Sequence, residues 1–153
     1  MSREFSKISP KVWRSKRFRA LPTDDARFLL LYLLTSEHQT SAGCFRMPDA
    51  YAASDLAWQV DKMQTARRHL VEGGLIAFDG STDEYFVLGW FEHNKPMNAS
   101  HQKSIVRVVS GVESDPVRET AEAELQPALI PSTVETLGGA RLGNSTYMQR
   151  RAS

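Results

Sequence analysis

The stretch PDAYAASDLAWQVDKMQTARRHLVEGGLIAFDGSTDEYFVLGWF, residues 48–91, determines the fold that we expect. Its pattern predicts a short helix capped by Asp49, a turn with Trp58 packed beneath it, and a second helix that ends at Gly73. Two strands, 75–79 and 84–91, follow and are joined by a short loop. This order of helix, turn, helix and hairpin predicts a winged helix-turn-helix domain.

The second helix of this motif separates apolar from polar positions. Met63, Ala66 and Leu70 recur at spacings of three and four, which places them on one face. We expect Asp61 and Gln64 to form a capping box at its start, and Gly73 to supply the left-handed residue at its end. The other face carries donors that suit base edges and phosphates, and its candidate DNA-binding residues are Lys62, Gln64, Thr65, Arg67, Arg68 and His69. A solvated helix face would show the same pattern.

The charge of the chain is unevenly distributed. Residues 1–22 hold seven basic residues and one acidic residue, a net charge of +6 in a chain whose formal net charge is +1. From residue 111 onward, six acidic residues outnumber four basic ones. A basic arm ahead of a helix-turn-helix motif is suited to phosphate contact, although it is equally compatible with a solvated surface. The further candidates for DNA contact are Lys16, Arg17, Arg19 and, on a short strand predicted at 43–47, Arg46.

The rest of the chain extends this motif at both ends. Residues 1–22 form the basic N-terminal arm, for which we expect extended structure with a turn of helix after Pro10. Residues 23–95 form the winged-helix domain, whose first helix starts at Thr23, and residues 96–130 form a C-terminal helical extension. Residues 131–153 are rich in Ser, Thr, Gly, Asn and Arg and predict a disordered tail. The predicted class is α+β and mostly α, with a small antiparallel sheet.

Motifs for catalysis, cofactors or metals are not apparent. The four histidines have no zinc-ligand spacing, and neither phosphate-binding glycine loops nor a nucleophile elbow occur. We therefore expect no enzymatic activity, no cofactor and no metal. The single cysteine, Cys44, suits a reducing compartment, and the longest apolar run is too short to span a bilayer. These features predict a cytoplasmic protein without membrane contact.

Several runs of residues resemble the N-terminal winged-helix domain of phage replication-initiation proteins, which is similar to that of the bacterial primosome protein DnaD. They include FRAL at 18–21, DDAR at 24–27, LYLLTS at 31–36, SAG at 41–43, DLAW at 55–58, LVEGGLI at 70–76 and WFEHNKP at 90–96. The resemblance covers roughly residues 4–125. It implies a winged-helix fold, a role in the DNA metabolism of a phage or mobile element, and self-association as a dimer or higher oligomer.

Two functions are consistent with the sequence. The first is double-stranded DNA binding in replication initiation or its control, with transcriptional or recombination regulation as related roles. The second is a protein-interaction module whose partner is a replication or recombination protein. The basic arm and the polar helix face favour the first. Three carboxylates in the predicted wing, Asp79, Asp83 and Glu84, would repel phosphate and favour the second.

Overall fold

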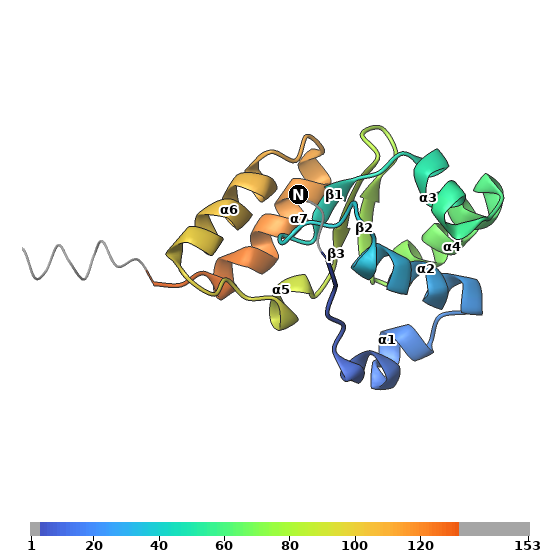
Figure 1. Cartoon of the computed structure of the whole chain (residues 1–153), viewed down its shortest axis with the longest axis horizontal. Helices are drawn as coiled ribbons and strands as arrows, with labels where there is room; N and C mark the ends of the chain where they lie inside the picture. The colour runs from blue at the N-terminus through green and yellow to red at the C-terminus, as the bar shows by residue number, and fades with distance from the viewer. Residues whose placement is uncertain (1–3, 132–153) are drawn as a thin grey trace, which may run out of the picture.

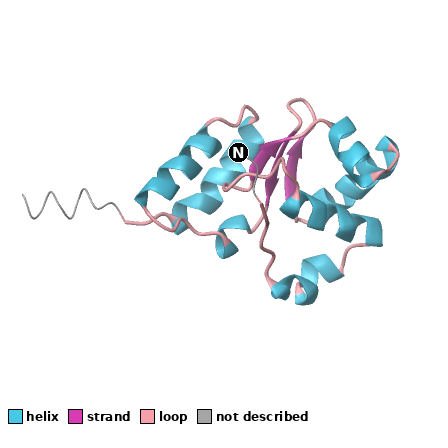
Figure 2. Ribbon diagram, in the orientation of Figure 1, coloured by secondary structure: helices cyan, strands magenta, loops and turns pink. Residues whose placement is uncertain are grey.

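A small antiparallel sheet separates two layers of helices, as Figures 1 and 2 show. The computed structural model describes residues 4–131. The sheet has the order β1-β3-β2, with β1 at Cys44–Arg46, β2 at Ile76–Asp79 and β3 at Glu84–Val87. One layer contains α2 (Asp24–Thr35), α3 (Asp49–Leu56) and α4 (Val60–Glu72). The other contains α5 (Trp90–His93), α6 (Ala99–Ser110) and α7 (Asp115–Leu125).

The first layer and the hairpin form the predicted winged helix-turn-helix. Helix α2 starts where expected, because the Thr23 side chain accepts a hydrogen bond from the amide of Ala26. Its buried residues pack against α4, whose Met63, Ala66 and Leu70 are at most 1% exposed. This apolar packing confirms the face of α4 that the periodicity assigned to the core.

The ends of the two motif helices differ from the prediction. The N-cap positions are Pro48 for α3 and Gln59 for α4, and neither side chain makes a capping hydrogen bond. Asp49 lies inside α3, where its carboxylate pairs with a side chain of α4 instead of the helix amides. The left-handed residue after α4 is Gly74, with φ of +72°, and not Gly73. The predicted caps were therefore wrong: Asp49 and Gln64 bind each other across the motif, and Asp61 Oδ1 accepts from the adjacent amide of Lys62.

Helical spacing also predicts that Tyr51 of α3, and Val106 of α6 together with Ile105 and Val109, face inward, and this is wrong for Tyr51 and Val106. Tyr51 is 56% exposed on α3, where its ring stacks on His38, and the neighbouring Ala53 is buried in its place. Val106 is 40% exposed on α6, whereas Ile105 and Val109 face the core as expected. Trp58 is only half-buried, so it does not act as the buried plug that we expected beneath the motif.

The second strand of the hairpin is shorter than predicted. It ends at Val87, because Gly89 takes a left-handed conformation with φ of +78° and the chain then turns into α5. Trp90 and Phe91, which we placed on the strand, lie in this helical turn and are buried. The apolar residues of the run 84–91 thus belong to two elements, β3 and α5, and both elements are packed in the core. A run of β-favouring residues does not show where one element ends and the next begins.

Alternate residues of the strands face different layers. Phe45, Phe78 and Tyr85 pack against α2 and α4, while Cys44 and Phe86 pack against α5, α6 and α7. Burial raises the pKa of the Cys44 thiol to about 12, as expected for a structural thiol. The sheet is therefore covered on both faces, whereas a small antiparallel sheet often leaves one face to solvent.

The basic arm is more helical than predicted. A 3-10 turn, η1 (Pro10–Arg14), leads into the short helix α1 (Lys16–Arg19) at the lower edge of Figure 1. Phe18 anchors the arm in the core, whereas Trp13 and Phe5 are 63% and 70% exposed. After α7 a second 3-10 turn, η2 (Gln126–Ala128), closes the described chain.

Parts of the predicted tail and of the basic arm lie outside the described residues. The disordered tail was predicted for residues 131–153, and all of it except Pro131 lies outside the described residues, as does Arg3 of the arm. Between residues 4 and 131, every helix is too short or too polar to traverse a lipid bilayer.

Gly43 allows a close contact between β1 and α5. Its φ is +73°, and a Cβ atom there would overlap the ring of Trp90, whose indole Nε1 donates to the carbonyl of Ser41 at 3.0 Å. We predict that Gly43→Ala lowers the free energy of unfolding by about 3 kcal/mol, from backbone strain and overpacking together. Gly80→Ala is the matched control, because its nearest neighbour would be 3.5 Å away. Equal urea midpoints for the two variants would contradict this packing.

Candidate nucleic-acid interface

The outer face of α4 presents donors to solvent. Lys62, Gln64, Thr65 and Arg68 are exposed, and His69 is partly buried near the C-terminal end of the helix. They lie opposite the buried residues of α4, so the fold holds them on one rigid surface. A helix of this kind, supported on a second helix, has the geometry that enters a major groove.

Arg67, which we included among the DNA-binding candidates, is occupied inside the protein. Its side chain is 11% exposed, and Nη1 donates to Asp49 Oδ1 at 2.5 Å and to the hydroxyl of Tyr85 at 2.8 Å. The guanidinium also lies over the ring of Phe78, 3.8 Å from its centroid. Arg67 therefore joins α3, α4, β2 and β3, and its Nη1 and Nη2 groups are engaged within the protein.

Electrostatics at this cluster follow from burial and pairing. Desolvation alone would raise the pKa of Asp49, but hydrogen bonds from Arg67 and Gln64 and the guanidinium charge outweigh it and hold that pKa below its ordinary value. Burial raises the pKa of Tyr85 to about 12 despite the opposing effect of Arg67. Asp49 is thus ionised and Tyr85 neutral near pH 7. Gln64 Nε2 donates to Asp49 Oδ2 at 2.9 Å, so one end of this exposed side chain is also held.

The two exposed cations of α4 have weak carboxylate partners. Lys62 Nζ lies 3.7 Å from Asp25 Oδ1 and 4.7 Å from the centroid of the Trp58 ring. Arg68 Nε lies 3.8 Å from Glu72 Oε1, and both side chains are more than 60% exposed. Exposed ion pairs of this kind contribute at most about 1 kcal/mol. Phosphate oxygens can replace these carboxylates at little cost.

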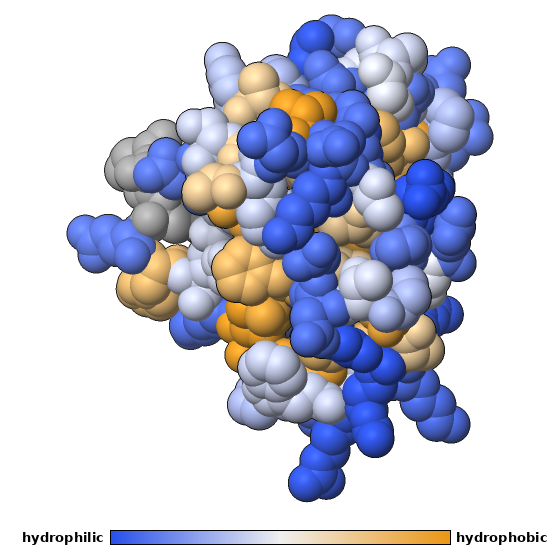
Figure 3. Space-filling view, turned by 90° about the vertical axis from the view of Figure 1, so that its right-hand side faces the viewer, coloured by the Kyte–Doolittle hydropathy of each residue, from blue (hydrophilic) through white to orange (hydrophobic). Residues whose placement is uncertain are grey.

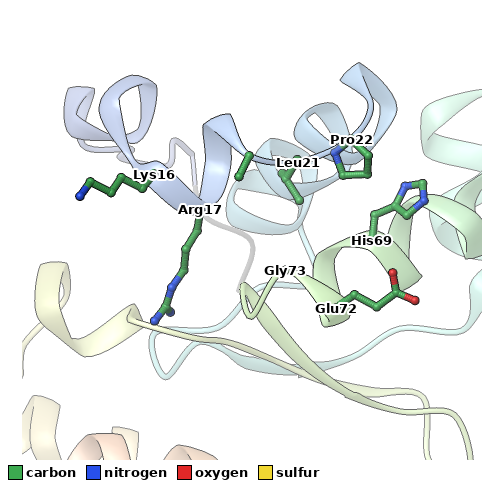
Figure 4. A pocket seen from close by; sticks show the side chains of 8 residues that line it. Lys16, Arg17, Leu21, Pro22, His69, Glu72 and Gly73 are labelled. Atoms are coloured by element: carbon green, nitrogen blue, oxygen red, sulfur yellow. The ribbon is translucent and has the colours of Figure 1, made fainter.

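The arm places further cations beside the C-terminal end of α4. Arg17 Nη1 donates to the carbonyl of Gly74 at 3.2 Å, which fixes α1 against the turn after α4. Figure 4 shows the pocket between the two helices, lined by Lys16 and Arg17 of α1, whose side chains point away from α4, and by His69 and Glu72 of α4. The structure thus brings two separate groups of sequence candidates together.

The described basic residues of the arm are exposed and form no ion pair with any other described residue, and the charge of Arg17 acts on Glu124 of α7 from beyond ion-pair distance. Within residues 4–131, no ion pair involves any of six basic residues of the arm, which are Lys7, Lys11, Arg14, Lys16, Arg17 and Arg19. In Figure 3, hydrophilic side chains project from the lower end of the molecule, where η1 and α1 lie in Figure 1. These six residues are the largest group of cations without an ion pair on the described part of the arm and α4.

Arg46 occupies a different position from the other candidates. It is exposed at the end of β1, where its Cα pairs in register with that of Glu84 on β3. Within the described part of the chain, neither a hydrogen bond nor an ion pair joins the Arg46 side chain to α4 or to the arm, so the structure does not bring Arg46 together with the other candidates.

The carboxylates of the predicted wing are mostly engaged within the protein. Glu84 is 8% exposed and accepts hydrogen bonds from the amides of Glu113 and Ser114 at 3.0 and 2.7 Å. Asp79 Oδ2 accepts from the Ser114 hydroxyl at 2.7 Å. The hairpin is therefore attached to the start of α7. Glu84 is buried and not free in solvent as we expected, whereas Asp79 is partly exposed and its hydrogen bonds from Ser81 and Ser114 lower its pKa, so it keeps its charge.

The sequence did not reveal two features of the site. One is the role of Arg67, although its position at the edge of the apolar stripe was the available signal. The other is the exposure of Trp13, because an aromatic residue in an apolar pattern is more often buried. Among the residues that the structure describes, no three His, Cys, Asp or Glu side chains are arranged to hold a metal ion.

Comparison of the chain with protein-family models, with known proteins and with solved structures finds no match.

Protonation of Asp49 should weaken the attachment of α4. Because its pKa is lowered on folding, ionised Asp49 stabilises the protein above its ordinary pKa of 3.8, and this contribution is lost as pH falls below that value. We predict that Asp49→Asn is less stable than the wild type at pH 6, and that the difference narrows towards pH 3. Urea unfolding across this range measures it. Asp61→Asn, at an exposed carboxylate, is the control, and a difference independent of pH would contradict the role of charge at Asp49.

Proposed function

We propose that this protein binds double-stranded DNA through α4 and the basic arm. The single observation that carries the proposal is the position of Lys16 and Arg17 beside the C-terminal end of α4, fixed by the hydrogen bond from Arg17 to the carbonyl of Gly74. With α4 in a major groove, the bordering phosphate strand passes the C-terminal end of the helix, where Lys16 and Arg17 lie. Base edges would then meet Gln64, Thr65 and Arg68, while the arm neutralises phosphates.

The biological process that we propose is replication initiation or its control in a phage or other mobile element, in the cytoplasm. Support comes from the resemblance of residues 4–125 to the winged-helix domain of replication-initiation proteins. The order α2, β1, α3, α4, β2, β3 agrees with this resemblance. Self-association would pair two α4 helices on one duplex and favour sites with two-fold symmetry.

One observation favours a protein-interaction module as the second candidate. Each cation of α4 has a carboxylate nearby, since Arg67 pairs with Asp49, Lys62 with Asp25 and Arg68 with Glu72. A recognition helix with compensated charge has little long-range attraction for DNA. Under this alternative, α4 contacts a protein and the duplex is bound weakly or only by the arm.

Removal of the α4 cations separates these candidates. We predict that Lys62→Ala combined with Arg68→Ala lowers affinity for a mixed-sequence duplex about tenfold or more at low salt. The slope of log affinity against log salt should decrease by up to about 1.8, because two phosphate contacts are lost. Fluorescence anisotropy across a salt series measures both. Lys103→Ala with Arg107→Ala removes the same charge from exposed positions on α6 and serves as the control. Equal loss of affinity in both double variants would contradict specific contact by α4.

The arm makes a different contribution to binding. Lys16→Ala combined with Arg17→Ala should lower affinity by a similar factor for every duplex sequence, because phosphate contacts carry no sequence information. Competition between two duplexes of equal length and different sequence measures the preference. A change in preference in this variant would show that the arm reads bases, contrary to the proposal.

A further inference from the structure

The inner side of the basic arm borders a groove with an apolar floor and a cationic rim. The groove has a volume of about 870 Å³. Its floor includes residues from the arm, α2, the hairpin and α5, which are Ile8, Val12, Phe18, Leu30, Leu34, Leu75, Val87, Leu88 and Trp90. Lys7, Lys11 and Arg14 are exposed at its edge, and His93 lies opposite on α5. None of the described residues that line it is Asp or Glu.

An exposed tryptophan stands next to this groove. Trp13 lies in the chain between Val12 and Arg14, which both line the groove, and its own side chain is 63% exposed. An edge-to-face contact with the buried Phe18, with ring centroids 5.7 Å apart, holds the indole in place. Most of a large aromatic surface is thus offered to solvent among lysines and arginines. An exposed ring among cations is the combination that binds a stacked base and its phosphate.

These features suit a chain of unpaired nucleotides better than a duplex. The outside of a duplex offers mainly phosphate and sugar, which would use the cations but neither the apolar floor nor the indole. Unpaired bases have apolar faces that stack on aromatic side chains, while their phosphates follow a positively charged groove. Six basic residues without an ion pair are spread over residues 7–19, and three of them, Lys7, Lys11 and Arg14, line the groove. A nucleic-acid strand carries one phosphate per nucleotide and can contact such a series of cations.

We propose that η1 and the groove behind it form a site for single-stranded nucleic acid, with Trp13 as the stacking platform. Lys7, Lys11 and Arg14 neutralise the phosphates of the same strand. This site goes beyond duplex binding by α4, because none of the residues that line the groove lies on α4. A protein with both sites can hold a duplex next to an opened strand, which fits a role in replication.

The experiment compares a 20-nucleotide oligo-dT with a duplex of equal length by fluorescence anisotropy. We expect Trp13→Ala to weaken oligo-dT binding about tenfold, and duplex binding less than twofold, because one stacked base is lost. Trp13→Phe should recover much of the affinity, since it keeps a ring. Tyr51→Ala is the control, because Tyr51 is 56% exposed on α3, away from the arm. Unchanged oligo-dT binding by Trp13→Ala, or an equal loss in Tyr51→Ala, would overturn the proposal.

A direct spectroscopic readout accompanies these affinities. Stacking of a base on Trp13 should quench tryptophan fluorescence in the wild type, and the quenching should be largely absent in Trp13→Phe. Competition with a polyglutamate peptide tests whether the site recognises more than negative charge. If this peptide displaces oligo-dT as effectively as an oligonucleotide of equal charge, the site is selective only for negative charge and the assignment is overturned. Thermal unfolding of each variant confirms that the fold is retained.

The same assay distinguishes failure of this proposal from failure of duplex binding by α4. Lys62→Ala with Arg68→Ala should weaken duplex binding and leave oligo-dT binding within about twofold, since those residues lie on α4. If that variant loses affinity for both ligands alike, a separate single-strand site is ruled out. Loss of oligo-dT binding in Trp13→Ala alone supports the site whether or not the duplex binds α4.

Discussion

The contact between Arg67 and Asp49 is the constraint on which the candidate interface depends. It joins the two helices of the motif, and the stacking of the guanidinium on Phe78 with its bond to Tyr85 joins them to the hairpin. The helix that presents Lys62, Thr65 and Arg68 is therefore fixed in rotation about its own axis. Truncation of either partner in a mostly buried pair leaves an uncompensated charge, which is strongly destabilising.

The second constraint is the attachment of the C-terminal helices to the hairpin. Buried Glu84 accepts from two amides at the start of α7, and Ser114 donates to Asp79. The free face of the sheet is thereby used for packing, and the hairpin is held close to the body. In our proposal the ligand contacts α4, which belongs to the other layer, and the arm. The two layers differ because alternate strand residues face different helices: Phe45, Phe78 and Tyr85 face the layer of α2 and α4, and Cys44 and Phe86 face the layer of α5, α6 and α7.

Much of this arrangement follows from the sequence alone. Apolar spacing identified the buried face of α4, and the capping side chain of Thr23 identified the start of α2. Local signals failed where distant groups compete. Asp49 and Gln64 were expected to cap helices but bind across the motif, and Glu84 was expected in solvent but is buried. Long-range pairing of this kind is set by tertiary contacts, which spacing along the chain does not encode.

The candidate site likewise has features that the sequence predicts and features that only the folded structure shows. Its residue types, and the side of α4 on which they lie, could be read from periodicity, and the charge of the arm from composition. The position of the arm beside the end of α4 could not, because it depends on the bond between Arg17 and Gly74 and on the anchoring of Phe18. The exposure of Trp13 is equally a product of the folded arm.

The central claim is that DNA contacts the outer face of α4 and the arm. Amide hydrogen exchange, followed by mass spectrometry with and without a duplex, tests this most directly. The account predicts slower exchange on binding in segments that cover residues 7–19 and 60–72, with α6 and α7 unchanged. Protection confined to α6 and α7, or no change anywhere at saturating duplex, would contradict it.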